Sequence, residues 1–166
     1  MKTQYCLNCG SELIDKLIDG ETRFACSKDC GYVLWNNPVP VVAAIVIYED
    51  KVLLARNAAW PEGIFALVTG FLEKGEDPFD GIKREVKEEL NLESTDVNLI
   101  GLYPFEKMNQ LIIAYEVKAS GEIELNEELA EYKLIEPHKL RAWEMGTGLA
   151  VKDWIKNRVK SLKSES

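Results

Sequence analysis

The chain has 166 residues, of which 46% are hydrophobic and 29% are charged, so it can bury the core of one compact domain with a small appendage. Its 28 acidic and 20 basic side chains give a formal net charge of -8, which argues against a protein that coats nucleic acid through a basic surface. The single histidine, His138, excludes every mechanism or metal site that needs two.

The predicted elements begin with a small unit over residues 1–37 that holds all four cysteines of the chain. They form two close pairs separated by 16 residues, and they are Cys6, Cys9, Cys26 and Cys30. Two such pairs of thiolates are typical of a structural Zn²⁺ site in which the protein fills every ligand position. We therefore expect a small zinc ribbon, with disulfides or buried free thiols as the alternative interpretation.

No segment of the sequence indicates export or insertion into a membrane. The N-terminus lacks the apolar core of a signal peptide, and the longest apolar run, 39–48, contains a proline and is only as long as a strand. We expect a cytoplasmic protein with no membrane partner, because thiols stay reduced in that compartment and can bind metal.

From residue 38 to residue 166 the composition changes to long apolar runs, which predict a second domain. The strands that these runs predict are 41–48, 51–56, 65–69, 97–103, 111–118 and 132–135. The first two flank Glu49-Asp50 and are expected to form a hairpin. Because strands come both before and after a central helix, we expect a mixed sheet packed between helices, which is an α/β fold.

Two helices are predicted in this second domain. The first begins at Pro78, after Asp77 as its cap. Its apolar stripe consists of Phe79, Ile82, Val86 and Leu90. The second helix spans 147–160, and the residues that it is expected to bury are Leu149, Trp154, Ile155 and Val159.

The first predicted helix also carries acidic side chains beside its apolar stripe. At about 100° per residue, Glu85 and Glu89 lie side by side next to the stripe, and Glu88 lies one step further out. Lys83 and Lys87 lie on the opposite flank, so they do not neutralise these acids. Such a cluster suits Mg²⁺ or Mn²⁺, which prefer oxygen ligands, whereas the alternative is a solvated acidic face.

Residues 70–92 resemble the Nudix box, a motif of the form G-x5-E-x7-R-E-U-x-E-E-x-G-U in which U is aliphatic. The matching residues are Gly70, Glu76, Arg84, Glu85, Val86, Glu88, Glu89 and Leu92. Asn91 stands where the family has glycine, and asparagine tolerates the left-handed backbone of a helix terminus. The resemblance implies a Nudix α/β/α sandwich with a mixed sheet, here preceded by a small zinc ribbon.

The resemblance to Nudix hydrolases also implies roles for individual residues. The implied catalytic set is Glu76, Arg84, Glu85, Glu88 and Glu89. Glu85 and Glu89 would be the principal magnesium ligands, Glu88 a further ligand or the base, and the Gly70 carbonyl another ligand. Glu76 and Arg84 would hold loop and helix together. The implied reaction is metal-dependent hydrolysis of a diphosphate linkage in a nucleoside diphosphate derivative, with a glutamate taking a proton from water.

A four-cysteine ribbon ahead of a Nudix domain resembles the NADH pyrophosphatase group. That resemblance implies Glu128 as an additional magnesium ligand and Ala150 as a substrate contact. It also implies a dinucleotide substrate such as NADH, FAD or ADP-ribose, and a homodimer.

The motif S-Q-P-W-P-F-P-x-S of that group is not kept in this chain. The corresponding stretch, 102–110, retains Pro104 but lacks the tryptophan, so strict specificity for NADH does not follow. Tyr103 and Phe105 in this stretch are candidates for substrate binding by stacking on an adenine or flavin ring. The alternative is that they are core aromatics.

Two further functions are compatible with the sequence. One is removal of a nucleotide cap from RNA, and the other is a non-catalytic module that senses a nucleotide. Such modules usually lose glutamates of the box, and this chain retains them, which favours catalysis. Residues 73–96 contain nine acids and four bases, so 4 minus 9 gives -5 of the total -8. The charge therefore points to a bound cation, and it disfavours a nucleic-acid partner without excluding one.

Overall fold

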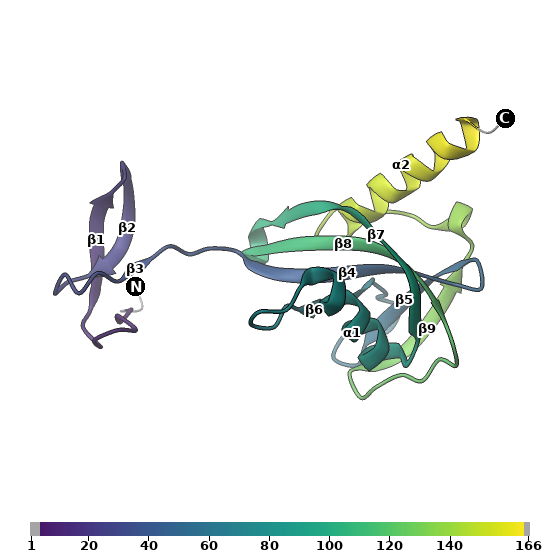
Figure 1. Cartoon of the computed structure of the whole chain (residues 1–166), viewed down its shortest axis with the longest axis horizontal. Coiled ribbons are helices and arrows are strands. Elements are labelled where there is room, and N and C mark those ends of the chain that lie inside the picture. Colours follow the sequence, from purple (N-terminus) through teal and green to yellow (C-terminus); the bar gives the residue numbers. More distant parts are fainter. Residues whose placement is uncertain (1–3, 165–166) are drawn as a thin grey trace. The chain divides into compact units, whose positions relative to one another are not determined.

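The computed structural model describes residues 4–164, with side chains up to residue 160. The described chain divides between Asn37 and Pro38 into two compact units (Figure 1). The first unit is a three-stranded antiparallel sheet in the order β1-β2-β3. Its strands are β1 (Leu13–Ile18), β2 (Glu21–Cys26) and β3 (Val33–Leu34). Its small core contains Cys6, Leu13 and Cys26, so two of the cysteines are buried where the chain has few other apolar side chains.

The second unit is built on a six-stranded mixed sheet in the order β7-β8-β4-β5-β9, with β6 paired to β4. Its strands are β4 (Val39–Tyr48), β5 (Lys51–Asn57), β6 (Val68–Phe71), β7 (Glu93–Phe105), β8 (Gln110–Ser120) and β9 (Leu129–Ile135). The β4–β8 pair is parallel and the other pairs are antiparallel. The helices are α1 (Pro78–Leu90) and α2 (Gly148–Ser164), with short 3-10 helices η1 (Glu106–Met108) and η2 (Pro137–Lys139).

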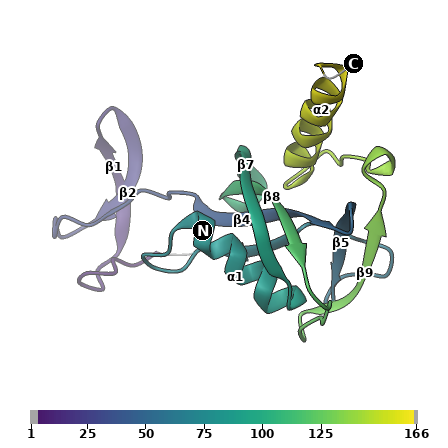
Figure 2. The same cartoon turned by 45° about the vertical axis from the view of Figure 1, so that its right-hand side comes forward.

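The central strand β4 is buried on both faces, because a helix covers each side of the sheet (Figure 2). Alternate residues of a strand point to opposite faces. Val42, Ala44 and Val46 accordingly belong to the core under α1, while Ala43 and Ile45 belong to the core under α2. The predicted α/β/α sandwich with a mixed sheet is therefore confirmed. Within residues 4–164, no helix is long and apolar enough to cross a membrane.

The predicted strands and helices are largely present, with shifts at their ends. The β4–β5 hairpin turns at Glu49 and Asp50, whose φ angles of 48° and 61° place both residues in the left-handed region of a tight turn. The strand predicted at 65–69 begins only at Val68, because Ala66 makes an isolated bridge to Ala55 instead of continuing the ladder.

Two residues that were predicted to be buried are exposed. Phe79 is 42% exposed, and Val159 is 47% exposed near the end of α2 that extends away from the sheet (Figure 1). Trp154 is buried as predicted, together with Ala150 and Val151, and Leu149 and Ile155 are partly buried against the same core. The apolar spacing predicted helix α2 correctly. The sheet covers only the first half of α2, so Val159 in its second half has no apolar partner.

Helix α1 begins and ends with the predicted caps. The Asp77 carboxylate accepts a hydrogen bond of 2.8 Å from the Phe79 N–H, and Pro78 occupies the first turn. Asn91 ends the helix with φ 59° and ψ 18°, and the Lys87 ammonium donates to its side-chain oxygen at 2.8 Å. Asparagine thus supplies the left-handed terminus at the position where the motif has glycine.

This terminus leads to the first prediction. We expect Asn91→Ala to lower the free energy of unfolding by about 1 kcal/mol more than Asn91→Gly does, because alanine is strained at positive φ and glycine is not. Both variants lose the side-chain contact with Lys87 and keep the contact of Lys87 with the backbone carbonyl, so the difference between them isolates the backbone term. Urea denaturation followed by circular dichroism measures it, and equal stabilities of the two variants would contradict this account of the helix end.

Candidate functional site

The packing of α1 against the sheet places two carboxylates at the edge of the core. Ile82, Val86 and Leu90 are fully buried against the sheet. Glu85 and Glu89 stand next to this stripe, and they are only 9% and 7% exposed. A carboxylate at such a position loses most of its hydration, so the site needs positive charge or hydrogen-bond donors to compensate.

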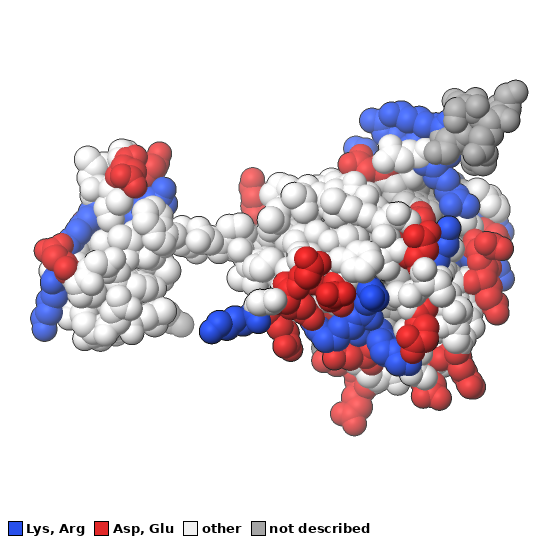
Figure 3. Space-filling model, in the orientation of Figure 1, with Lys and Arg blue, Asp and Glu red and all other residues white. Residues whose placement is uncertain are grey.

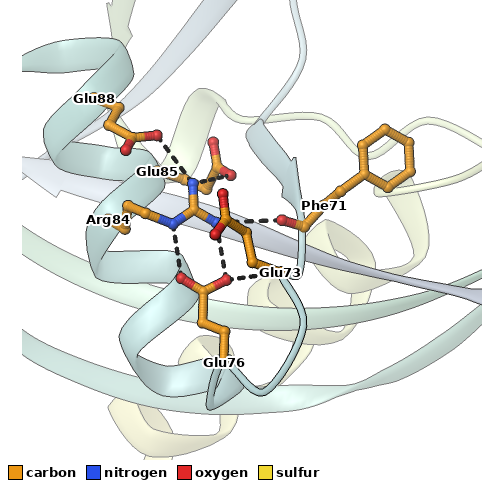
Figure 4. A network of polar contacts seen from close by, with 6 residues as sticks. All are labelled: Phe71, Glu73, Glu76, Arg84, Glu85 and Glu88. Carbon is orange, nitrogen blue, oxygen red and sulfur yellow. Dashed lines mark hydrogen bonds and ion pairs between the residues drawn. The ribbon is translucent and has the colours of Figure 1, made fainter.

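Arg84 supplies part of that compensation through both edges of its guanidinium group (Figure 4). One edge makes a bidentate pair with Glu76, from Nε to Oε1 at 2.7 Å and from Nη2 to Oε2 at 2.9 Å. The Nη1 atom donates to Glu85 at 2.7 Å and to Glu88 at 2.9 Å. Nη2 also donates to the Phe71 carbonyl at 3.2 Å, so one side chain joins β6, the following loop and the helix.

Glu76 is held as an anion in the loop between β6 and α1. The bond from Arg84 lowers its pKa to about 2, with help from the Glu73 N–H, which donates to its carboxylate at 3.0 Å. Glu76 is thus ionised across the physiological range and serves as an anchor for Arg84.

The two buried carboxylates behave differently from Glu76. Burial raises the pKa of Glu85, although its bond to Arg84 opposes this shift. Burial also raises the pKa of Glu89 to about 8, and the charges of Glu85, Glu128 and Glu88 add to the effect. Desolvated carboxylates that repel one another are an oxygen-rich set suited to a hard divalent cation.

Gly70 of β6 lies directly beneath the Glu85 carboxylate. A Cβ atom built at this glycine would lie 1.8 Å from Glu85 Cδ and 1.9 Å from its Oε1 atom. Only a residue without a side chain lets the carboxylate pack against the strand here. Among the described residues the acids of α1 do not form a metal-binding group as close as the four cysteines of the first unit, so their role as metal ligands stays a prediction.

The loop between β8 and β9 brings Glu128 toward this site. The Asn126 N–H donates to the Glu89 carbonyl at 3.2 Å, and the Asn126 side chain accepts from the Glu128 N–H at 3.0 Å. The Glu128 carbonyl in turn accepts from the Ala58 N–H at 2.7 Å. These contacts hold Glu128 near Glu89, and the charge of Glu128 contributes to the raised pKa of Glu89. The role of Glu128 as a metal ligand stays a prediction.

The predicted substrate contacts lie elsewhere. Tyr103 is 9% exposed, and its hydroxyl donates to Asp153 at 3.1 Å in the core under α2. Ala150 is fully buried in the same core, and Phe105 is half-buried against Gly146. The sheet separates this core from the acids of α1. The burial of Tyr103 favours the alternative that it is a core aromatic, and stacking by these residues stays a prediction.

Backbone groups and one loop residue complete the site, and sequence reasoning missed them. They are the Phe71 carbonyl, the Glu73 N–H and Asn126. Backbone donors and acceptors leave no signal in residue type. Asn126 could have been found only from its nearness to Glu128 in the sequence.

The cysteine pairs of the first unit converge as their spacing predicts. The four Sγ atoms lie within 4.8 Å of one another, and the cysteines are free, not disulfide-bonded. Cys6 faces Cys30 and Cys9 faces Cys26, each with sulfur atoms 3.4 Å apart. Each pair is followed by a glycine at positive φ, which turns the chain tightly around the sulfur atoms. The four cysteines are therefore positioned to bind a metal ion.

Comparison with known proteins identifies similar chains. The family model described as NUDIX domain matches residues 38–153. The chain is 32% identical over 105 residues to the NAD-capped RNA hydrolase NudC of Mycobacterium bovis, covering 63% of this chain and 33% of that protein. It is 30% identical over 121 residues to the protein of that name from Pseudomonas aeruginosa, covering 72% of this chain and 42% of that protein. The chain thus spans less than half the length of these curated relatives.

A solved structure extends the comparison to the fold. The crystal structure of a NUDIX hydrolase from Nitrosomonas europaea superposes with a TM-score of 0.71 and 28% sequence identity. The match covers 82% of this chain and 80% of that one.

The contact between Gly70 and Glu85 yields the second prediction. We expect Gly70→Ala to lower the free energy of unfolding by about 1–3 kcal/mol, because the new methyl group overlaps the Glu85 carboxylate. In a Glu85→Ala background the same change should cost less than about 0.5 kcal/mol, since the overlapping group is gone. Urea denaturation of the four proteins completes this cycle. An equal cost of Gly70→Ala in both backgrounds would show that the carboxylate does not lie on the strand.

Proposed function

Because the chain belongs to the NUDIX family, whose domain model matches residues 38–153, we propose that it hydrolyses a diphosphate linkage in a nucleoside diphosphate derivative. The observation that carries the proposal is the pair of buried carboxylates, Glu85 and Glu89, beside the bare backbone of Gly70. Like charges are seldom buried together unless a cation joins them. A binding module that only senses nucleotides would not need to retain them.

A divalent cation, Mg²⁺ or Mn²⁺, is the proposed cofactor of this site. The proposed ligands are the carboxylates of Glu85, Glu88, Glu89 and Glu128 and the carbonyl of Gly70. When bound, the cation neutralises charge on the diphosphate and lowers the pKa of a coordinated water molecule. Unlike Glu85 and Glu89, Glu88 is open to solvent, with 56% of its side chain exposed, and Glu128 is exposed as well.

The protein's own side chains then perform two tasks in the proposed reaction. One glutamate of the set accepts the proton of the attacking water at its carboxylate oxygen. Arg84, anchored by Glu76, holds Glu85 and Glu88 in place through Nη1 and limits their repulsion before the cation binds.

The proposed substrate is a dinucleotide of the NADH, FAD or ADP-ribose type. A second candidate is the nucleotide cap of an RNA, and the names of the relatives from Mycobacterium bovis and Pseudomonas aeruginosa favour it. Both substrates present the same diphosphate to the acids of α1, so one site would serve either reaction.

The first unit is proposed to be a zinc ribbon over residues 1–37, ahead of a hydrolase domain over 38–166. Its four cysteines would bind a structural Zn²⁺ ion, and the small core around Cys6 and Cys26 would depend on that ion for stability. Free thiols of this kind persist in a reducing compartment, which supports a cytoplasmic location.

The third prediction concerns catalysis. We expect wild-type protein to hydrolyse at least one member of a panel of dinucleotides and nucleotide sugars with Mg²⁺ or Mn²⁺, and to be inactive with EDTA. Glu89→Gln should lower kcat by at least about 100-fold, because it removes a proposed ligand. Steady-state kinetics measure the effect.

The matched control for this prediction is Asp80→Asn, which neutralises an exposed acid of the same helix, with 71% of its side chain exposed. It should keep kcat within about twofold of wild type. If wild type turns over nothing in the panel, or if Glu89→Gln is as active as Asp80→Asn, the proposed function is wrong.

The fourth prediction concerns zinc. We expect wild-type protein to contain one zinc ion per chain by elemental analysis, and Cys26→Ser to retain less than a tenth of it, since about a quarter of the ligand set is lost from a closed site. Ser27→Ala, which changes the neighbouring residue, should keep full zinc content. Wild-type protein free of zinc after expression in zinc-supplemented medium would overturn the zinc ribbon.

A further inference from the structure

Helix α2 carries a row of lysines that no part of the proposed hydrolysis uses. Lys152, Lys156 and Lys160 recur at every fourth position and are all exposed. Within residues 4–160, where side chains are described, none of the three takes part in an ion pair. Figure 3 shows basic side chains gathered along this helix, on a protein whose overall charge is -8. We call these three residues the lysine row.

The lysine row faces away from the sheet. At about 100° per residue its members fall within roughly 80° of one another, on the side opposite Trp154. Trp154 is buried, and its indole N–H donates to Glu116 of β8, which fixes the rotation of the helix. A rise of about 1.5 Å per residue separates neighbouring amino groups of the row by about 6 Å along the helix.

Two ordinary explanations do not account for the lysine row. Cations stabilise the C-terminal turn of a helix, but Lys152 and Lys156 lie in the second and third turns of α2, beyond the reach of that effect. Ion pairs with acids three or four residues away on the same helix do not account for the row either. Between residues 148 and 160 the one acid is Asp153, and it accepts a hydrogen bond from Tyr103.

We propose that the lysine row binds the phosphates of an RNA chain whose 5′ nucleotide is cleaved at the acids of α1. This inference rests on the RNA-cap form of the proposed function. Evenly spaced amino groups suit the repeating phosphates of a flexible single strand, and they need no particular base sequence. A free dinucleotide has no phosphate for the lysine row to bind, because its only phosphates are those that the acids of α1 would hold through the cation.

The position of the row adds a requirement for RNA length. Helices α1 and α2 cover opposite faces of the sheet, so an RNA must pass around the sheet to reach from the acids to the lysines. We therefore expect the lysine row to leave kcat/KM unchanged for a capped RNA of two nucleotides and to raise it fully for a capped RNA of about 20 nucleotides.

The experiment compares wild-type protein with the triple variant Lys152→Gln/Lys156→Gln/Lys160→Gln. Its substrates are free NAD, NAD-capped RNA of two nucleotides and NAD-capped RNA of 20 nucleotides. We expect kcat/KM for the longest substrate to fall at least about tenfold, and kcat/KM for free NAD to stay within about twofold. The slope of log K against log salt for the long RNA should become less negative by about 2, as three phosphate contacts predict.

A control variant has the same change of charge. Lys107→Gln/Lys139→Gln/Arg141→Gln removes three exposed basic side chains from η1, η2 and the residue that follows Leu140. It should behave like wild type. The proposal is wrong if the control lowers activity on the long RNA as much as the triple variant does, or if the triple variant lowers activity on all substrates alike.

A binding measurement separates this proposal from the proposed function. Fluorescence anisotropy with uncapped single-stranded RNA of 20 nucleotides reports on the row even if no substrate is hydrolysed. Tight, salt-dependent binding that the triple variant loses supports the row, whereas no binding overturns it. Sedimentation with vesicles containing 30% phosphatidylserine tests a membrane surface as the partner, and row-dependent binding to vesicles but not to RNA would also overturn the proposal.

Discussion

The contact between Arg84 and Glu76 is the interaction on which the acidic site depends. Its bidentate geometry joins the loop after β6 to the second turn of α1 and fixes the orientation of the guanidinium group. The opposite edge of that group then reaches Glu85 and Glu88. Without this cation, the carboxylates of α1 would repel one another beside the apolar core, and the helix would bury them at a larger cost.

The sandwich architecture explains why those carboxylates are buried at all. Ile82, Val86 and Leu90 must face the sheet to cover one side of β4, and Glu85 and Glu89 follow them into the interface because they are neighbours on the helix surface. Burial and function therefore oppose each other in α1: the packing that stabilises the domain desolvates the groups that a cation would bind. Proteins commonly give up stability in this way at functional sites.

Each face of the sheet serves a different purpose. The face under α1 carries the acids and Gly70, and the loop with Glu128 closes toward it. The face under α2 is a core in which Tyr103 and Ala150 are buried. The exposed side of α2 carries the lysine row. The acids of α1 and the lysine row of α2 therefore lie on opposite sides of one domain. A substrate with a diphosphate at one end and a chain of phosphates at the other would meet both.

The sequence by itself determined the features that depend on neighbours along the chain. The Asp77 cap, the left-handed Asn91 and the hairpin at Glu49-Asp50 follow from local spacing and residue type. The spacing of the two cysteine pairs likewise predicted one common site. A mixed sheet between helices also followed, because strands before and after the central helix restrict the packing, but the order and pairing of the strands did not.

Only the tertiary structure decided which side chains are exposed to solvent and which carboxylates lie near one another. The burial of Tyr103 beside Asp153 is not visible in the sequence, where a core aromatic and a stacking residue look alike, and Val159 is exposed because the sheet ends before it. Glu128 approaches Glu89, and Gly70 lies under Glu85, through strand pairings and loops that join distant parts of the chain. Periodicity predicts which face of an element is apolar, but it does not predict which element packs on that face. The packing partner depends on the order of the strands in the sheet and on where each element ends.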